Sequence, residues 1–116
     1  GVVGAITPWN FPIAIPSWKM LPALVAGNTV VFKPASDTPA LGERFVELLV
    51  EAGLPPGVVN LVHGFGETVG EAIVRHPDVP VITFTGSSKV GWGIRAEVPH
   101  KKVNLELGST ASNARR

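Results

Sequence analysis

The segment PWNFP, residues 8–12, places an amide side chain between two aromatic residues and two prolines. An unpaired amide in apolar surroundings costs on the order of 1–3 kcal/mol. Asn10 therefore needs either a structural partner or a chemical role, and the neighbouring residues do not decide between the two.

A second polar side chain, Glu106, lies in the apolar segment VNLEL, residues 103–107. A glutamate inside an apolar strand is rarely left buried and unpaired. One interpretation places it on the exposed face of an edge strand, with Asn104 beside it on the same face. The other is a general base held in a cleft, its proton affinity raised by apolar surroundings. The spacing alone favours the exposed strand face.

The segment GFGETVG follows an expected strand and opens an expected helix, which is the context of a phosphate-binding turn. Its glycines stand at positions 64, 66 and 70, one residue wider than the G-x-G-x-x-G fingerprint of dinucleotide-binding folds. An ordinary tight turn between strand and helix explains the spacing equally well. The helix after Gly66 carries Thr68 and Glu71 at capping-box spacing.

The segment FTGSS repeats this arrangement at the end of another expected strand. Gly86 allows a close approach of backbone to a ligand, and Ser87 offers a hydroxyl and an amide where an anion is favoured. An ordinary serine N-cap explains the same residues. The helix begins at Ser87 or Ser88 and directs Val90 and Ile94 inward. Two such turns at neighbouring strand ends favour a ligand in the crevice between them.

Lys33 ends another expected strand, in the segment FKPAS. A lysine at such a place is usually solvated. At the carboxyl edge of a central strand it points toward the same crevice, where a phosphate or ribose is a credible partner. The three histidines, His63, His76 and His100, do not share ligand spacing, so the sequence predicts no metal site.

Short β-branched or apolar segments bounded by Gly, Pro or Asn predict strands at residues 30–33, 58–63, 81–84 and 103–107. Residues 13–27 predict a helix kinked or entered at its prolines, and another helix begins at Pro39 with Gly53 as its C-cap. Strands alternating with helices are typical of parallel βαβ units. The sequence therefore predicts an α/β fold, an open parallel sheet with flanking helices.

The composition is that of one domain with an apolar bias. The 116 residues are 45% hydrophobic and 16% charged, which suggests surface covered by a missing domain or a partner subunit, including a homo-oligomer. The net charge of +1, without a polybasic stripe, favours no nucleic acid. The sequence contains no stretch of about 18 apolar residues, so it predicts no membrane span. With no cysteine, the chain has no disulfide or thiol nucleophile, and a cytoplasmic setting is the default.

Five segments in this order and spacing resemble the aldehyde dehydrogenase superfamily: PWNFP, GNTVVFKPAS, GFGETVG, FTGSSKVG and NLELG. The match covers residues 1 to about 108. The resemblance implies that residues 1–108 form part of an NAD(P)-binding domain with a Rossmann-like parallel sheet, followed by a polar tail at residues 109–116. The opening PWNFPIAIPSWK is most similar to bacterial semialdehyde dehydrogenases.

The resemblance also implies roles for single residues. Asn10 would be the side-chain donor of the oxyanion hole, held by its prolines and aromatic neighbours, and the loss of such a donor typically costs about 2.7–4 kcal/mol. Glu106 would be the general base that activates water to release the acyl enzyme. The implied cofactor contacts are Thr7, Pro8 and Trp9 at the nicotinamide end, Lys33 with Pro34, Ala35 and Ser36 at the adenosine ribose, Gly66 and Glu67 beside the adenine, Gly86 and Ser87 at the pyrophosphate, Val90 packed on the adenine and, without an assigned part of the cofactor, Asn10, Leu107 and Gly108.

The chain departs from the family pattern at two places. Many NAD-preferring members carry Glu where this chain has Ser36, and a serine beside Lys33 tolerates the 2′-phosphate of NADP. We therefore expect NADP to be possible, with NAD not excluded. A second glycine usually follows ELG, but here Ser109 and the segment TASNARR stand instead. That departure suggests a truncated or frameshifted product, or a deliberately cut domain.

The family's nucleophile is a cysteine, and this chain contains none. The full mechanism is thiolate attack on the aldehyde, hydride transfer to nicotinamide, and hydrolysis of the thioester. We therefore expect cofactor contacts, one oxyanion donor and one base, but no dehydrogenase turnover, and an aldehyde substrate only in a complete enzyme. The alternatives are a non-catalytic nucleotide-binding module and a fragment that docks on a full-length subunit.

Overall fold

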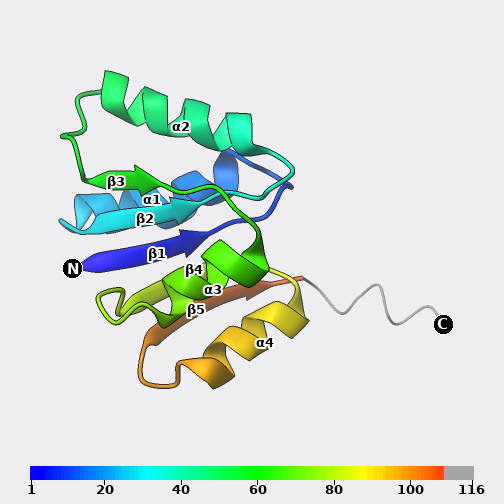
Figure 1. Cartoon of the computed structure of the whole chain (residues 1–116). Coiled ribbons are helices and arrows are strands. Elements are labelled where there is room, and N and C mark those ends of the chain that lie inside the picture. Colours follow the sequence, from blue (N-terminus) through cyan, green and yellow to red (C-terminus); the bar gives the residue numbers. More distant parts are fainter. Residues whose placement is uncertain (109–116) are drawn as a thin grey trace.

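A five-stranded parallel sheet forms the centre of the computed structural model, which describes residues 1–108 (Figure 1). The sheet order is β3-β2-β1-β4-β5, and every neighbouring pair is parallel. The strands are β1 (Val2–Ile6), β2 (Thr29–Lys33), β3 (Val59–Leu61), β4 (Val81–Gly86) and β5 (Lys102–Leu107). The predicted fold class is therefore confirmed.

Helices cover both faces of this sheet (Figure 1). The helical elements are α1 (Ala14–Val25), α2 (Pro39–Glu51), the single π-helical turn η1 (Gly66–Gly70), α3 (Glu71–Arg75) and α4 (Ser88–Glu97). One apolar core, around Phe32 and Met20, lies between the sheet and α1 and α2. The other, around Ile82 and Phe84, lies between the sheet and α3 and α4. None of these helices is long and apolar enough to cross a membrane within residues 1–108.

The central strand β1 was not among the predicted strands. Its sequence, VVGAI, is buried on both faces apart from its half-buried first residue, so it lacks the alternation that marks a half-exposed strand. Gly4 is needed there because a Cβ would lie 2.7 Å from Ile73 Cγ2 and 3.0 Å from Ile82 Cδ1. Because a glycine interrupts this short apolar segment, the sequence does not reveal β1. This strand nevertheless pairs with the strands on both of its sides, β2 and β4.

The two helices predicted on one side of the sheet, α1 and α2, are both present, and their ends lie close to the predicted ones. The helix expected at residues 13–27 spans Ala14–Val25, with Pro22 inside it. The helix from Pro39 ends at Glu51, but its C-cap is Ala52, so the prediction of Gly53 as the C-cap is wrong by one residue. Gly53 adopts a φ of +99°, the left-handed conformation that closes a helix end and that glycine adopts without strain.

The capping box expected at Thr68 and Glu71 is wrong. Thr68 lies inside the π-helical turn η1, and its hydroxyl donates to the carbonyl of Phe65 at 3.3 Å. The helix after β4 begins as predicted, with Ser87 as its N-cap and Ile94 buried. Val90 is 50% exposed, so the expectation that it points inward is wrong. The predicted polar tail, residues 109–116, lies outside the described residues.

Candidate functional site

The carboxyl ends of the strands meet at one edge of the sheet because all the strand pairs are parallel. Backbone hydrogen bonds join the segments that leave this edge. Thr7 N donates to Lys33 O at 3.2 Å, and Gly108 N donates to Gly86 O at 3.1 Å. The structure therefore brings together segments that the sequence analysis selected from separate strand ends, which is where open α/β sheets bind ligands.

The loops after β2 and β3 are joined by a side-chain hydrogen bond. The hydroxyl of Ser36 donates to the carbonyl of Gly64 at 3.1 Å. Pro34 is buried, Ala35 is half-buried and Ser36 is exposed, so this loop rises from the sheet toward solvent. A bond between the two loops fixes the distance between Lys33 and the start of η1.

Lys33 is a buried cation at the end of β2. Its exposed fraction is 4%, and its Nζ donates to the carbonyl of Pro34 at 3.1 Å. The aliphatic stem lies against Gly70, where a Cβ would be 3.9 Å from Lys33 Cδ. No ion pair to Lys33 occurs within residues 1–108. Burial lowers the pKa of this ammonium group, and an ammonium has donors left for a ligand oxygen.

A cleft of about 470 Å³ lies between η1 and α3 on one side and α4 on the other. Ile6 and Phe84 are among its lining residues. Three of the predicted cofactor contacts also line it: Gly66, Glu67 and Val90. The exposed side chain of Val90, which the sequence analysis expected inside the core, is therefore an apolar part of the cleft wall. The other predicted contacts lie along the sheet edge, outside this cleft.

The turn at Gly86 and Ser87 has the structure of an ordinary helix start. The hydroxyl oxygen of Ser87 accepts the N–H of Val90 at 3.3 Å. A Cβ on Gly86 would lie 2.5 Å from Phe84 Cζ, so the close approach at this glycine is made by an aromatic ring of the chain itself. The turn nevertheless delivers Val90 to the cleft.

Asn10 lies in an exposed segment. Trp9 is 63% exposed and Phe11 is 67% exposed, and Asn10 itself is exposed. In this structure the two aromatic neighbours of Asn10 therefore do not cover its amide. Phe11 has a φ of +52°, a left-handed conformation that is strained for a bulky residue, and its carbonyl accepts the N–H of Ile15 at 3.1 Å. Asn10 thus precedes a strained turn that leads into α1.

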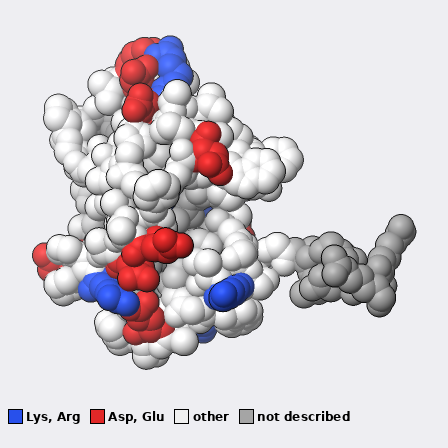
Figure 2. All heavy atoms as spheres, turned by 45° about the vertical axis from the view of Figure 1, so that its right-hand side comes forward, with Lys and Arg blue, Asp and Glu red and all other residues white. Residues whose placement is uncertain are grey.

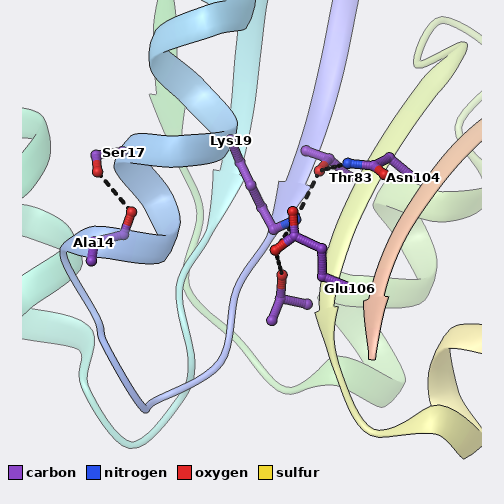
Figure 3. Close-up of polar contacts among 7 residues, drawn as sticks. Ala14, Ser17, Lys19, Thr83, Asn104 and Glu106 are labelled. Atoms are coloured by element: carbon purple, nitrogen blue, oxygen red, sulfur yellow. Dashed lines mark hydrogen bonds and ion pairs between the residues drawn. The ribbon is translucent and has the colours of Figure 1, made fainter. Parts of the chain in front are cut away.

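A polar cluster on the α1 face of the sheet was not predicted (Figure 3). Lys19 of α1 points toward the sheet, where its Nζ donates to Thr83 Oγ1 at 3.1 Å and lies 3.5 Å from Glu106 Oε2. Thr85 Oγ1 donates to the same carboxylate oxygen at 3.1 Å. Asn104 Nδ2 donates to Thr83 Oγ1 at 3.4 Å. The cluster joins α1 to β4 and β5.

The two ionic side chains of this cluster differ in burial. The side chain of Lys19 is 1% exposed, whereas that of Glu106 is 51% exposed. Burial lowers the pKa of Lys19, and the charge and hydrogen bond of Glu106 partly oppose that effect. Glu106 and Asn104 are both exposed on one face of the edge strand β5, which confirms the interpretation that the spacing favoured. The neighbours of Glu106 are an ammonium and a hydroxyl, so the alternative of apolar surroundings is wrong. Both contacts are to Oε2, and Oε1 has no hydrogen bond or ion pair within residues 1–108.

One signal in the sequence could have found Lys19. The buried residues of α1 are Ile15, Pro16, Lys19 and Met20, so the lysine occupies the i+4 position of the inward stripe. A lysine there is rarely buried unless it is paired. Its partners, Thr83 and Glu106, lie 64 and 87 positions further along the chain, where no local pattern indicates them.

A family model described as "Aldehyde dehydrogenase family" matches residues 1–114. The chain is 54% identical over 111 residues to retinaldehyde dehydrogenase 3 of Mus musculus, covering 93% of this chain and 22% of that protein. It is also 54% identical over 110 residues to phenylacetaldehyde dehydrogenase of Pseudomonas fluorescens, with the same two shares. The chain therefore spans about a fifth of the length of these relatives.

Solved structures are similar to the fold as well as to the sequence. An NAD+ complex of aldehyde dehydrogenase from Bacillus cereus matches with a TM-score of 0.89 at 50% identity, over 93% of this chain and 22% of that one. An indole-3-acetaldehyde dehydrogenase complexed with NAD+ matches with a TM-score of 0.90 at 45% identity, over 94% and 23%.

Proposed function

Because the chain belongs to the aldehyde dehydrogenase family, we propose that it forms the NAD(P)-binding portion of an enzyme that oxidises an aldehyde or semialdehyde to the carboxylic acid. The observation that carries this proposal is the cleft between η1 and α4, which opens beside the carboxyl edge of the parallel sheet. Relatives of the same fold are solved as complexes with NAD+, which supports a nicotinamide dinucleotide as the ligand.

The residues at this edge fit such a cofactor. The cleft offers Gly66, Glu67 and the apolar wall at Val90 to an adenine, and the buried ammonium of Lys33 offers donors to a ribose. Gly86 ends β4 and Ser87 is the N-cap of α4, and a helix start of this kind suits a pyrophosphate. Thr7, Pro8 and Trp9 follow β1 and are left for the nicotinamide end. The bound nicotinamide supplies the hydride acceptor.

The cofactor preference depends on Ser36. A carboxylate at this position would bond the ribose hydroxyls and repel a 2′-phosphate, whereas the Ser36 hydroxyl is neutral and bonds to Gly64 O. We therefore expect Ser36→Glu to shift the affinity ratio toward NAD by about tenfold, equivalent to about 1.4 kcal/mol. Tryptophan fluorescence titrations of the 116-residue chain with NAD and with NADP measure the ratio.

Ser36→Ala is the matched control for this experiment, because it removes the hydroxyl without adding a charge. It should leave the ratio within about twofold of that of the wild-type chain. An unchanged ratio in Ser36→Glu would exclude this loop from the 2′-phosphate position. Failure of the wild-type chain to bind either dinucleotide would refute the proposed function itself.

Two residues are proposed for the chemistry of the complete enzyme. Asn10 donates to the aldehyde oxygen as it becomes anionic. Glu106 takes a proton from the attacking water through Oε1, while Lys19 and Thr85 hold Oε2 and so orient the carboxylate. The chain has no cysteine, so it cannot itself form the thioester. The cytoplasmic setting also stays a prediction.

A second candidate function, docking on another subunit, is favoured by one observation. Large apolar side chains near the start of α1 are exposed, with Trp9 at 63%, Phe11 at 67% and Trp18 at 64%. Exposed aromatic surface of this kind marks interaction sites. A homo-oligomer or a full-length partner is the occupant proposed for it.

A further inference from the structure

One guanidinium group connects the two helices on either side of the cleft. Arg75, the last residue of α3, has its Nη2 3.4 Å from Glu71 Oε2, and its Nε donates to Glu97 Oε1 of α4. Both carboxylates belong to residues that line the cleft, whereas Arg75 does not line it. Figure 2 shows acidic and basic side chains lying against one another on the lower part of the molecule.

The connection lies at one end of the cleft. Gly66 starts η1 and Lys89 lies in the first turn of α4, so these lining residues mark the end nearest the carboxyl edge of the sheet. Glu97 is the last residue of α4, and Glu71 begins α3. The Glu71–Arg75–Glu97 group therefore closes the end of the cleft that lies further from the sheet edge.

Apolar packing holds both helices on the sheet, because Ile73 of α3 and Ile94 of α4 belong to the same core cluster. Ile73 and Val74 are buried against the sheet and fix the height of α3 above it. Lys101 Nζ donates to the carbonyls of Val74 and His76 at 2.6 Å each, which ties the end of α3 to the loop before β5. Among the described residues, no other ion pair or side-chain hydrogen bond joins α3 directly to α4.

We propose that Arg75 is a positioning residue that sets the separation of α3 and α4 at the end of the cleft further from the sheet edge, and with it the width of the cleft in which the base lies. A flat heteroaromatic base needs contact on both faces, so a wider cleft loses one of them. The proposal rests on the proposed function for the identity of the ligand, an adenine nucleotide. The spacing of the helices does not depend on that identity.

The binding test uses Arg75→Met in the 116-residue chain. We expect adenosine monophosphate and NAD to bind about two- to fivefold more weakly, the range for loss of an exposed ion pair. Nicotinamide mononucleotide has no adenine, so its affinity for the variant should equal its affinity for the wild-type chain. A general loosening of the fold would weaken all three ligands. Arg75→Glu combined with Glu97→Arg should restore the affinity for adenine nucleotides, because it restores opposite charges on the two helices.

The matched control is Arg44→Met. Arg44 also lies between two glutamates, Glu47 at 3.0 Å and Glu51 at 2.8 Å, but on α2, which covers the other face of the sheet. It should leave the affinities for all three ligands unchanged. Equal affinities for Arg75→Met and the wild-type chain would overturn the proposal.

A second readout measures the helix spacing without any ligand. The chain has no cysteine, so nitroxide labels can be placed at Ala72→Cys on α3 and Ala96→Cys on α4, both of which are exposed. Arg75→Met should reduce the dipolar broadening of the spectrum because the labels move apart. If the wild-type chain binds no adenine nucleotide but this broadening falls, the proposed function fails while Arg75 keeps its positioning role. Unchanged broadening overturns that role.

Discussion

Lys33→Met should stabilise the folded chain and weaken its binding of NADP and NAD. Lys33 is buried, and within residues 1–108 its ammonium group donates one hydrogen bond, to the carbonyl of Pro34. A buried charge without an acidic partner costs stability, whereas a methionine fills similar space without a charge. We expect the variant to gain about 1–3 kcal/mol in unfolding free energy at neutral pH. The loss of a charged donor should weaken cofactor binding by about tenfold or more.

The unfolding free energy gained by Lys33→Met should decrease as the pH rises. Burial lowers the pKa of Lys33 below the ordinary value of 10.5, so the unfolded chain binds the proton more tightly than the folded chain does. The stability of the wild-type chain therefore rises as the pH passes from the lowered pKa toward 10.5. The advantage of the variant is fully present below the lowered pKa, and it shrinks toward pH 10.5.

Urea denaturation of both chains at several pH values measures this difference. Lys102→Met, which replaces an exposed lysine of β5, is the matched control and should change stability by no more than about 0.5 kcal/mol. A variant that loses stability while keeping its cofactor affinity would mean that Lys33 is a structural residue with no ligand.

Gly64→Ala should be the most damaging small substitution in the loop before η1. Gly64 has a φ of +150°, a conformation essentially restricted to glycine, and a Cβ would lie 2.2 Å from Val69 Cγ2 and 2.9 Å from Val69 Cβ. Backbone strain of about 1–3 kcal/mol and a packing clash of about 1–3 kcal/mol together predict a loss of about 2–6 kcal/mol. Because Gly64 O also accepts the Ser36 hydroxyl, cofactor affinity should fall as well.

Gly93→Ala separates this effect from the mere addition of a methyl group. Gly93 lies within α4, and a Cβ there would meet no heavy atom within 4 Å. Alanine in place of glycine inside a helix should raise stability by about 0.5–1 kcal/mol. The midpoint temperature of thermal unfolding should therefore fall for Gly64→Ala and rise for Gly93→Ala. If Gly64→Ala left the unfolding temperature unchanged, this loop would relax around the added methyl group without a loss of stability.

The parts of the fold that follow local patterns could be predicted from the sequence. Residues 30–33 and 81–84 are β-branched and apolar segments next to helix starts, and both are strands of the parallel sheet. Because parallel strands share one carboxyl edge, the turns at Gly66 and Gly86 could be expected to lie near each other. Strand β1 was missed because burial on both faces removes the alternation that marks a strand.

The site was less predictable because its contacts join distant positions. Nothing near Lys19 indicates Glu106, and the pair forms only when α1 packs on the strands. The prolines and aromatics around Asn10 did not decide whether its amide has a structural partner, and Trp9 and Phe11 are exposed in this structure. Composition shows how apolar a segment is, whereas its enclosure depends on what packs against it.

The most direct test of the cofactor site is an NMR titration of the isotope-labelled chain with NADP, read residue by residue. We expect saturable shifts of backbone amides at the carboxyl edge of the sheet and around the cleft, at Lys33, Gly66, Gly86, Ser87 and Val90. Amides of α2, such as that of Glu47, should not move. A chain that unfolds cooperatively but shows no saturable shift at these residues, with NADP or with NAD, would contradict the assignment of this edge as a cofactor site.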